Sequence, residues 1–328
     1  MTQFGYALAS EEHRPLDLVR YAALAEESGF EFALISDHYH PWVDAQGQSS
    51  FIWTVLGGIA TATEKLRVGT GVTCPIIRYH PALVAQMAAT AASMMEGRFF
   101  LGIGSGEGLN EHIYGDHFPP PVIRQEMVLE AVEIIRELWE GEEVTHHGEF
   151  FAVEEACLYT LPDTLPEIYM AADGPRAAEI AAEVCDGLIS VSPDKEIISS
   201  FEKSGGKGKP RFGHVAVCYA RNEAEARRTA HHYWPISGLQ GDAKWELRST
   251  KHFDGLVKGV TEDQVAESIL CSADPEKHAA HMQPFIDAGY DHVYLHQIGP
   301  DQESFFRFYR DEVLPHMRQT RQPARKSA

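Results

Sequence analysis

Eight short apolar runs alternate with segments of helical periodicity along almost the whole chain, and this alternation limits the possible folds more than any other feature. The runs have the length of buried strands, and the segments between them repeat apolar residues at the spacing of one helix face. Strand–helix units build parallel sheets, which can close into a barrel. We therefore expect an α/β fold, a (β/α)8 TIM barrel, with strands at 4–9, 30–35, 66–72, 98–104, 166–172, 187–191, 212–220 and 291–297.

The helices expected between these strands cover residues 14–28, 51–63, 81–95, 124–139, 176–184, 194–203, 223–234, 275–288 and 302–317. Residues 147–153 indicate one additional short strand or a hairpin. Residues 236–260 have little periodicity and follow the seventh strand, so we expect an insertion of short helices that could act as a lid over the carboxyl ends of the strands. No linker divides the chain, which predicts one domain over residues 1–328 with a disordered tail at 318–328.

The composition is acidic, with 48 Asp and Glu residues against 28 Lys and Arg residues and a net charge of -20. Such a surface repels phosphate backbones, so we do not expect nucleic-acid binding.

The five cysteines are scattered and form no CxxC motif, which indicates a reducing compartment without disulfides or a zinc site. The N-terminus has no secretory pattern and no apolar run is long enough for a membrane span, so we expect a cytoplasmic protein.

Ionisable and aromatic residues are packed together directly after the second expected strand, in the stretch Ser36 to Trp42. The strand ends of a barrel share one mouth, where His38 would meet Glu107 from the end of the fourth strand. His38 can accept a proton and Glu107 can donate one. Trp42 could pack against a ring or donate its indole N–H to a developing anion. A capped loop with surface histidines is the alternative for this stretch alone.

Two further turns are suited to holding a large ligand. The run Gly69 to Pro75 would let a flat ring approach the backbone, because glycine tolerates unusual φ/ψ angles. The fifth strand ends in Ala171-Ala172-Asp173-Gly174-Pro175, a small-residue turn before a helix, where free N–H groups can hold a phosphate. Asp173 could instead cap the helix, and its negative charge counts against a phosphate at this turn.

The remaining histidines and tryptophans leave alternatives open. His146-His147 and His231-His232 are adjacent pairs, and the members of such a pair do not share one face of a helix or strand, so we expect no metal site. His40 either lines the site or caps the turn. Trp234 either forms a wall of the substrate pocket or packs in the core.

The chain carries six motifs at its strand ends and turns. They are Phe4-Gly5-Tyr6, Ser36 to Trp42, Gly69 to Pro75, Arg78-Tyr79-His80-Pro81-Ala82, Leu101 to Glu111 and Ala172-Asp173-Gly174-Pro175. Together these motifs resemble those of the luciferase-like flavin and deazaflavin oxidoreductases. The resemblance extends from Phe4 to about Met317, and the SDH-x-x-PW and G-x-G-E-x-x-N signatures place it nearest the branch of F420-dependent glucose-6-phosphate and secondary alcohol dehydrogenases.

The resemblance implies a homodimer with coenzyme F420, a two-electron deazaflavin, in the barrel mouth. Gly71 and Val72 match a pair joined by a non-prolyl cis peptide. The positions that match contacts to the ring and its side chain are Asp37, Thr73, Ser105, Gly106, Glu107 and Asn110. Those that match the phosphate end are Ala171, Ala172, Asp173 and Gly174.

The resemblance also implies catalytic roles. The residue matching His38 takes the substrate hydroxyl proton, and a hydride passes to the deazaflavin. The residue matching Glu107, facing the ring from the other side, protonates the ring nitrogen, and the one matching Trp42 steadies the intermediate. FMN in place of F420 is an alternative that the sequence does not separate. A non-catalytic ligand-binding barrel is a third reading.

The substrate follows less directly from the resemblance. The sugar-phosphate dehydrogenases of this branch hold the phosphate with two lysines and an arginine. Lys244 matches one lysine, whereas the other positions fall near Asp194 and on Ser268. Loss of a bidentate guanidinium removes most phosphate recognition, which disfavours glucose 6-phosphate. We expect a secondary alcohol or hemiacetal, or the reverse reduction of a carbonyl, with substrate contacts from Lys244, Trp234 and His40.

Overall fold

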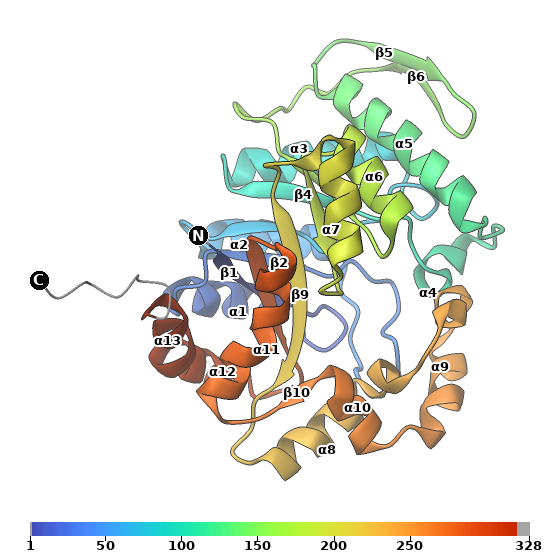
Figure 1. Cartoon of the computed structure of the whole chain (residues 1–328). Helices are drawn as coiled ribbons and strands as arrows, with labels where there is room; N and C mark the ends of the chain where they lie inside the picture. Colours follow the sequence, from blue (N-terminus) through green and yellow to red (C-terminus); the bar gives the residue numbers. More distant parts are fainter. Residues whose placement is uncertain (1, 320–328) are drawn as a thin grey trace, which may run out of the picture.

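The computed structural model describes residues 2–319, with the backbone alone for 242, 243 and 319. Eight parallel strands form a closed barrel, which confirms the expected fold (Figure 1). In order around the barrel they are β1 (Gln3–Leu8), β2 (Phe32–Ile35), β3 (Arg67–Thr70), β4 (Phe99–Ile103), β7 (Ile168–Ala171), β8 (Gly187–Ser190), β9 (Arg211–Cys218) and β11 (His292–Gln297). The pairing of β11 with β1 closes the ring, and the short β10 (Leu270–Cys271) pairs with β9 outside it.

Helices surround the barrel near the positions expected from the sequence (Figure 1). The bounds of the main helices are α1 (Pro15–Glu27), α2 (Ile52–Ala62), α3 (Pro81–Met94), α5 (Pro121–Leu138), α6 (Pro175–Val184), α7 (Lys195–Phe201), α8 (Glu223–Tyr233), α11 (Pro275–Ala288) and α12 (Gln302–Phe308). Proline occupies the first turn of α1, α3, α5, α6 and α11, where its missing N–H needs no partner. The last helix continues through a π-helical turn, Tyr309–Val313, into α13 (Leu314–Gln319).

Aromatic side chains fill the half of the barrel interior that lies at the amino-terminal ends of the strands. Phe212 lies at its centre, with ring centroids 4.9 Å from Tyr169, 5.1 Å from Phe32 and 5.5 Å from Phe100. Because these rings fill the amino-terminal half of the interior, space for a ligand inside the barrel lies toward the carboxyl ends of the strands. A second and larger core packs the helices against the outside of the sheet.

The expected hairpin and insertion are both present. Strands β5 (Val144–His147) and β6 (Ala152–Ala156) form a hairpin after α5. The insertion consists of short helical segments, Pro235–Gly238, Asp242–Glu246, α9 (Thr250–Leu256) and Val257–Gly259. It packs at the carboxyl ends of the strands, where Ile236 and Phe253 share a hydrophobic cluster with Trp42 and Leu109. Helix α10 (Glu262–Ser268) and β10 were not predicted from the sequence.

The end of the chain differs from the prediction of a tail beginning at residue 318. Arg318 and Gln319 belong to α13, and the Arg318 guanidinium donates to the carbonyl of Gly29 at 3.0 Å. The rest of the predicted tail, residues 320–328, lies outside the described residues. Within residues 2–319, no helix has the length and apolar character needed to cross a membrane.

Candidate active site

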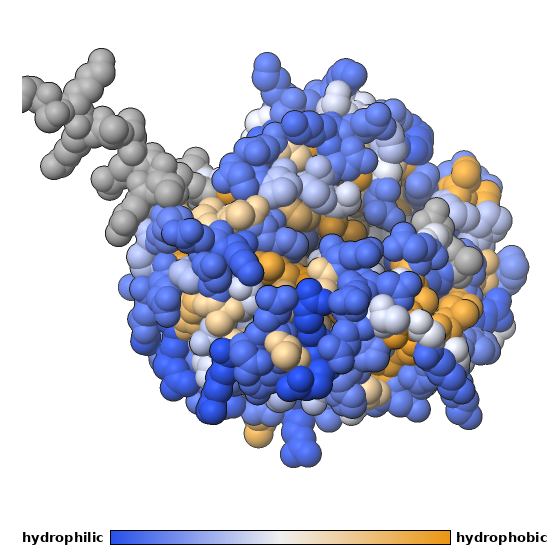
Figure 2. Space-filling model, turned by 60° about the horizontal axis from the view of Figure 1, so that its bottom comes forward, coloured by the Kyte–Doolittle hydropathy of each residue, from blue (hydrophilic) through white to orange (hydrophobic). Residues whose placement is uncertain are grey.

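A cavity of about 570 Å³ opens at the carboxyl ends of the barrel strands. Its volume is in the usual range for small-molecule and cofactor sites. Leu34, His214 and Tyr294 line its inner end, His38 and Trp42 line one wall, and Phe253 of the insertion contributes another. Figure 2 views this end of the molecule and shows a mostly hydrophilic surface with hydrophobic side chains in the recesses.

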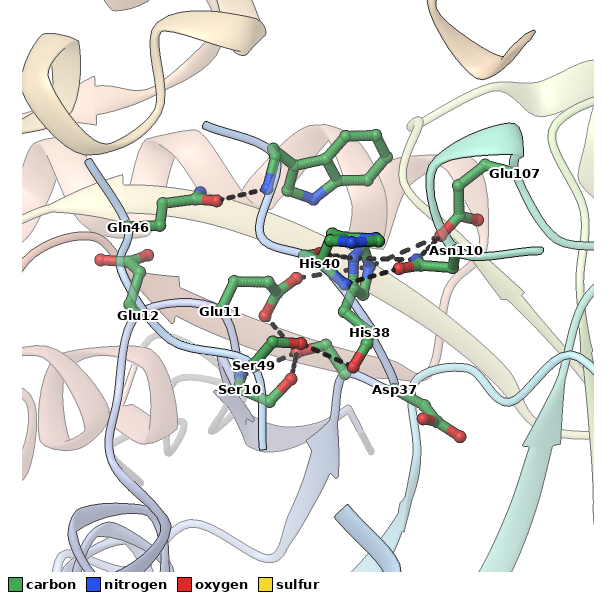
Figure 3. A network of polar contacts seen from close by, with 12 residues as sticks. Ser10, Glu11, Glu12, Asp37, His38, His40, Gln46, Ser49, Glu107 and Asn110 are labelled. Atoms are coloured by element: carbon green, nitrogen blue, oxygen red, sulfur yellow. Dashed lines mark hydrogen bonds and ion pairs between the residues drawn. The ribbon is translucent and has the colours of Figure 1, made fainter. Parts of the chain in front are cut away.

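His38 lies between two carboxylates in this cavity wall (Figure 3). Its Nε2 atom is 3.4 Å from Oε1 of Glu11 and 3.8 Å from Oε1 of Glu107. These side chains follow three different strands, β1, β2 and β4, whose carboxyl ends meet as the barrel fold predicts. His38 and Glu107 therefore occupy one site, but the expectation that they face a ring from opposite sides is wrong, because 3.8 Å between them leaves no room for a ring.

Asn110 joins the acid and the base. Its Oδ1 atom accepts the backbone N–H groups of Tyr39 at 2.8 Å and His40 at 3.1 Å, which fixes the orientation of the amide. The Nδ2 group then donates to Glu107 and lies 3.0 Å from Nδ1 of His38. Because Asn110 is 1% exposed, its side chain acts as an internal connector between the loop after β2 and the short helix α4 (Gly108–Glu111).

Glu11 and Glu12, which the sequence interpretation missed, are central to this region. Glu11 is buried and accepts a hydrogen bond from Ser36 in addition to its contact with His38. Glu12 accepts N–H groups from Trp234, from Gly299 at 2.8 Å and from His296 at 3.2 Å. Burial alone would raise the pKa of Glu12, but the hydrogen bonds and charge of His296, with the Trp234 N–H, lower it overall. The sequence signal that could have identified them is their position as two adjacent acidic residues directly after an apolar strand.

Asp37 and Thr73 lie behind the cavity wall rather than in it. The Asp37 carboxylate accepts from Nη2 of Arg78 at 3.0 Å and from the Thr73 hydroxyl at 2.7 Å, and it points away from His38 (Figure 3). Burial opposes the charged form of Arg78, but Asp37, Tyr79 and Glu111 outweigh it and raise its pKa. Neither Asp37 nor Thr73 lines the cavity, and their side chains support its wall. The coenzyme contact inferred for them from the resemblance stays a prediction.

The glycine-rich ends of β3 and β4 pack too closely for other side chains. The Gly71–Val72 peptide bond is cis, as the resemblance implied, and Gly71 lines the cavity. A Cβ atom on Gly71 would lie 2.8 Å from Cβ of Leu34, and one on Gly104 would lie 2.7 Å from Cγ2 of Val72. The same Cβ would also lie 3.6 Å from Cβ of Ala171. The absence of a side chain at Gly104 therefore allows Val72 and Ala171 to lie close to each other.

The other predicted coenzyme positions lie at the ends of β3, β4 and β7, outside the lining of this cavity. Gly106 has a φ of +73°, in the left-handed region that favours glycine, and a Cβ there would contact Cys74 and Glu111. The N-cap residue of α6 is Gly174, one residue after Asp173. A Cβ on Gly174 would meet no atom within 4 Å, so the helix start faces open space. The residues in this group are Val72, Ser105, Gly106, Ala171, Ala172, Asp173 and Gly174.

Of the three predicted substrate residues, Lys244 and Trp234 line the cavity and His40 does not. The Lys244 ammonium lies 5.0 Å from the centre of the Trp245 ring. The Trp234 indole N–H donates to Glu12, so this residue both walls the cavity and holds a buried carboxylate. His40 instead hydrogen-bonds the carbonyl of Leu109 at 3.0 Å and stacks on His112, which is the turn-supporting alternative.

A closed parallel barrel with acid and base side chains gathered at its carboxyl-end mouth is the arrangement found in TIM-barrel enzymes. The sequence pattern of the luciferase-like monooxygenases matches residues 1–292, and the chain belongs to this family. Among its relatives is the F420-dependent glucose-6-phosphate dehydrogenase of Microbacterium testaceum, which is 33% identical, with 96% of this chain and 97% of the relative aligned.

A second relative and one solved structure extend the comparison. The F420-dependent hydroxymycolic acid dehydrogenase of Mycobacterium tuberculosis is 34% identical, over 96% of this chain and 88% of that protein. The structure of an F420-dependent secondary alcohol dehydrogenase in complex with an F420–acetone adduct superposes with a TM-score of 0.89 at 30% identity, covering 96% of this chain and 99% of that one. The resemblance inferred from the motifs is thus confirmed.

Proposed function

We propose that this protein is an F420-dependent dehydrogenase that transfers a hydride between the deazaflavin and a carbon bearing a hydroxyl or carbonyl group. The observation that carries the proposal is the placement of His38 within 4 Å of both Glu11 and Glu107 at the wall of the barrel cavity. The class of enzyme is supported by relatives named for F420 that align over nearly the whole chain.

The residues at the mouth fit a large flat coenzyme. Gly71 presents backbone without a side chain to the cavity, and the cavity volume of about 570 Å³ is sufficient for a ring system and part of a substrate. The open start of α6 at Gly174 offers backbone N–H groups for the phosphate end. The residues proposed to hold the coenzyme are Gly71, Val72, Ser105, Gly106, Ala171, Ala172, Asp173 and Gly174, with Asp37, Thr73 and Asn110 holding these segments in place. When bound, F420 supplies a two-electron hydride acceptor or donor.

His38 takes the proton of the substrate hydroxyl at Nε2, which is unprotonated when Nδ1 donates its own hydrogen to the backbone carbonyl of His40 at 3.2 Å. The imidazolium formed in this step has the Glu11 carboxylate 3.4 Å away, and opposite charges at this distance attract strongly when both side chains are largely buried, as these are. Glu11 is held by Ser36 and is buried, so it orients the imidazole without moving during the reaction. This arrangement favours proton removal from an alcohol and, in the reverse direction, proton donation to a carbonyl oxygen.

Glu107 supplies the second acid–base group. Its Oε1 accepts a hydrogen bond from Asn110, and no described residue hydrogen-bonds its other carboxylate oxygen, which can carry a proton. The ring centroid of Trp42 lies 5.1 Å from that of His38 and 5.4 Å from that of Phe253. Trp42 and Phe253 together close the site. The pair of aromatic side chains limits the access of water to His38, which strengthens the electrostatic interactions there.

The substrate is proposed to be a secondary alcohol or hemiacetal, or the corresponding carbonyl compound. Among the described residues that line the cavity, Lys244 is the one lysine or arginine, and Ser268 lines the wall with a hydroxyl. The single ammonium group of Lys244 would bind a phosphate weakly compared with two lysines and a guanidinium. The homodimer remains a prediction.

Two parallel titrations test the cofactor. Purified protein is titrated with oxidised F420 and, separately, with FMN, and binding is followed by the change in fluorescence of the ligand. We expect saturable F420 binding and much weaker FMN binding. Preferential binding of FMN would support the flavin-dependent alternative, and absence of binding to both would favour a non-catalytic barrel.

A further inference from the structure

The cavity extends from the barrel axis into a side arm between the end of β8 and helix α11. Strands β8 and β9 pair only up to Ser190 and Gly213, so from His214 onward β9 has no β8 partner. Helix α11 packs beside this part of β9 (Figure 1), and His281 hydrogen-bonds the backbone of Ala216 there. The arm is therefore bounded by α11 on one side and by residues 191–193 on the other.

The walls of the arm are mainly apolar. Val191 and Pro193 follow β8, and Pro284 and Phe285 come from α11. Val191 is 59% exposed although it lines the cavity, which places it at the outer rim. An apolar ligand group that covered this exposed valine beside the apolar cavity would bury apolar surface, which favours binding.

The arm carries the hydroxyl of Ser192, and its ionisable groups are the imidazoles of His214 and His281, which are uncharged. Burial, with a smaller contribution from His296, lowers the pKa of His214 to about 3, and burial also lowers the pKa of His281. The ring of His214 packs 5.0 Å from Tyr294 and 5.4 Å from His296, and within residues 2–319 no hydrogen bond joins its ring nitrogens to protein. Neutral imidazoles can hydrogen-bond an uncharged oxygen but do not attract an anion.

The fixed charges near the arm also disfavour an anionic substrate. Glu11 lines the same cavity, and Glu12 lies directly behind it, where its lowered pKa keeps it ionised. Lys244 is on the insertion, where its ammonium lies against Trp245. A phosphate in the arm would therefore meet neutral imidazoles and nearby carboxylates without a guanidinium to balance them.

We propose that this arm binds an uncharged, largely apolar substituent of the substrate, attached to the carbon that His38 activates. The proposal rests on the proposed function and specifies its substrate class: secondary alcohols, or the corresponding ketones, with an extended alkyl or aryl group. The substituent would lie along Phe285 and Pro284 and leave the protein at Val191.

Binding of a homologous series of methyl ketones tests the arm without requiring turnover. Trp42, Trp234 and Trp245 line the cavity, so quenching of tryptophan fluorescence reports occupancy. We expect affinity to rise about 3- to 4-fold for each added methylene until the arm is filled. Glucose 6-phosphate should bind more weakly than the longer ketones. An affinity that does not change with chain length, or tighter binding of the sugar phosphate, would overturn the proposal.

A matched pair of variants separates the arm from general effects. Val191→Asp places a charge at the rim of the arm, whereas Val122→Asp places one at an equally exposed position, 64% exposed, on α5. We expect the first variant to reduce the gain per methylene to less than 2-fold, and the second to leave it unchanged. An equal gain in affinity per methylene in the two variants would contradict the assigned location of the arm.

Turnover distinguishes this proposal from the function on which it rests. If 2-propanol reduces F420 but chain length has no effect on binding, the arm assignment is wrong and the dehydrogenase function stands. If ketone binding depends on chain length but no alcohol reduces F420, the dehydrogenase function is wrong while the arm is still an apolar binding site.

Discussion

The Nε2 atom of His38 lies 3.4 Å from the carboxylate of Glu11, and both side chains emerge from the ends of the neighbouring strands β1 and β2. Glu107 approaches the same nitrogen from β4 at 3.8 Å. One imidazole is thus placed to take a proton beside two carboxylates with different surroundings.

Removal of the imidazole should abolish most proton transfer while leaving the coenzyme site intact. We expect His38→Ala to lower kcat by about 10²- to 10⁴-fold, the usual contribution of a general base. The dissociation constant for F420, measured by fluorescence titration, should change less than about threefold. His147→Ala serves as the control, because that side chain is 65% exposed on the hairpin. Turnover like that of the wild type in His38→Ala would assign His38 to binding or scaffold.

Glu11 should act through His38. In Glu11→Gln the carboxamide keeps its size but loses the negative charge beside the imidazole, and we expect kcat to fall by about tenfold or more. KM for the alcohol should remain near the wild-type value, and Glu11→Asp should recover part of kcat. Glu154→Gln, at a 67% exposed side chain, is the control. A change confined to KM would mean that Glu11 binds substrate directly.

Asn110 should link stability with catalysis. Asn110→Ala removes the acceptor of two backbone N–H groups and the donor to Glu107, so we expect unfolding to require about 1 to 3 kcal/mol less free energy. It should also lower kcat, because the acid and the base lose their common support. Urea unfolding and steady-state kinetics on the same preparation measure both. A kcat equal to that of the wild type in a destabilised variant would restrict Asn110 to a structural role.

Asp37 provides a test between a coenzyme contact and a supporting role. Its side chain is 1% exposed and that of Arg78 is 5% exposed, so Asp37→Asn leaves a buried guanidinium with less compensation. We expect a loss of about 3 to 5 kcal/mol in unfolding free energy. F420 affinity of the folded variant, measured below its unfolding temperature, should fall only modestly. Normal stability with a large loss of affinity would instead support the contact inferred from the resemblance.

His278 should make the fold sensitive to acid. Burial lowers its pKa to about 4, and in the neutral form Nε2 donates to the carbonyl of Ser272 at 3.0 Å while Nδ1 accepts from Tyr309 at 2.8 Å. Because the pKa is lowered on folding, the unfolded chain binds the proton first as pH falls. The stabilisation is present above about pH 6.5 and is lost toward about pH 4.

From about pH 7 to about pH 5 this one group should reduce the unfolding free energy by about 2 kcal/mol. Denaturant unfolding of wild type and His278→Gln at a series of pH values measures the difference in slope. We expect a shallower loss of stability in the variant, since glutamine does not titrate. Parallel curves for the two proteins would contradict the assignment.

The fold could be predicted from the sequence because its signals are local. Apolar runs of strand length, helical periodicity and proline at helix starts are all visible along the chain, and the structure has elements at the expected places. The short β10 was missed because two residues, Leu270–Cys271, carry no pattern. The third strand ends at Thr70 rather than Val72, since beyond it the segment forms only an isolated bridge between Thr73 and Ile103.

The site could be predicted only in part, because residue type does not show direction or partners. His38 and Glu107 were found from their places at strand ends. Asp37 stands beside His38 in the sequence, yet its carboxylate turns to Arg78 from another loop. The buried carboxylate of Glu12 depends on His296 near the other end of the chain, and such a pairing exists only in the folded protein.

Transfer of a hydride from an alcohol to F420 tests the central claim most directly. Purified protein is mixed with oxidised F420 and a panel of secondary alcohols, and loss of the visible absorption band of the coenzyme is followed with wild type and His38→Ala. We predict bleaching with at least one alcohol at a rate that depends on protein concentration, with a strongly reduced rate in the variant. Binding of F420 without bleaching by any alcohol, and without its reversal by any carbonyl compound, would contradict the account.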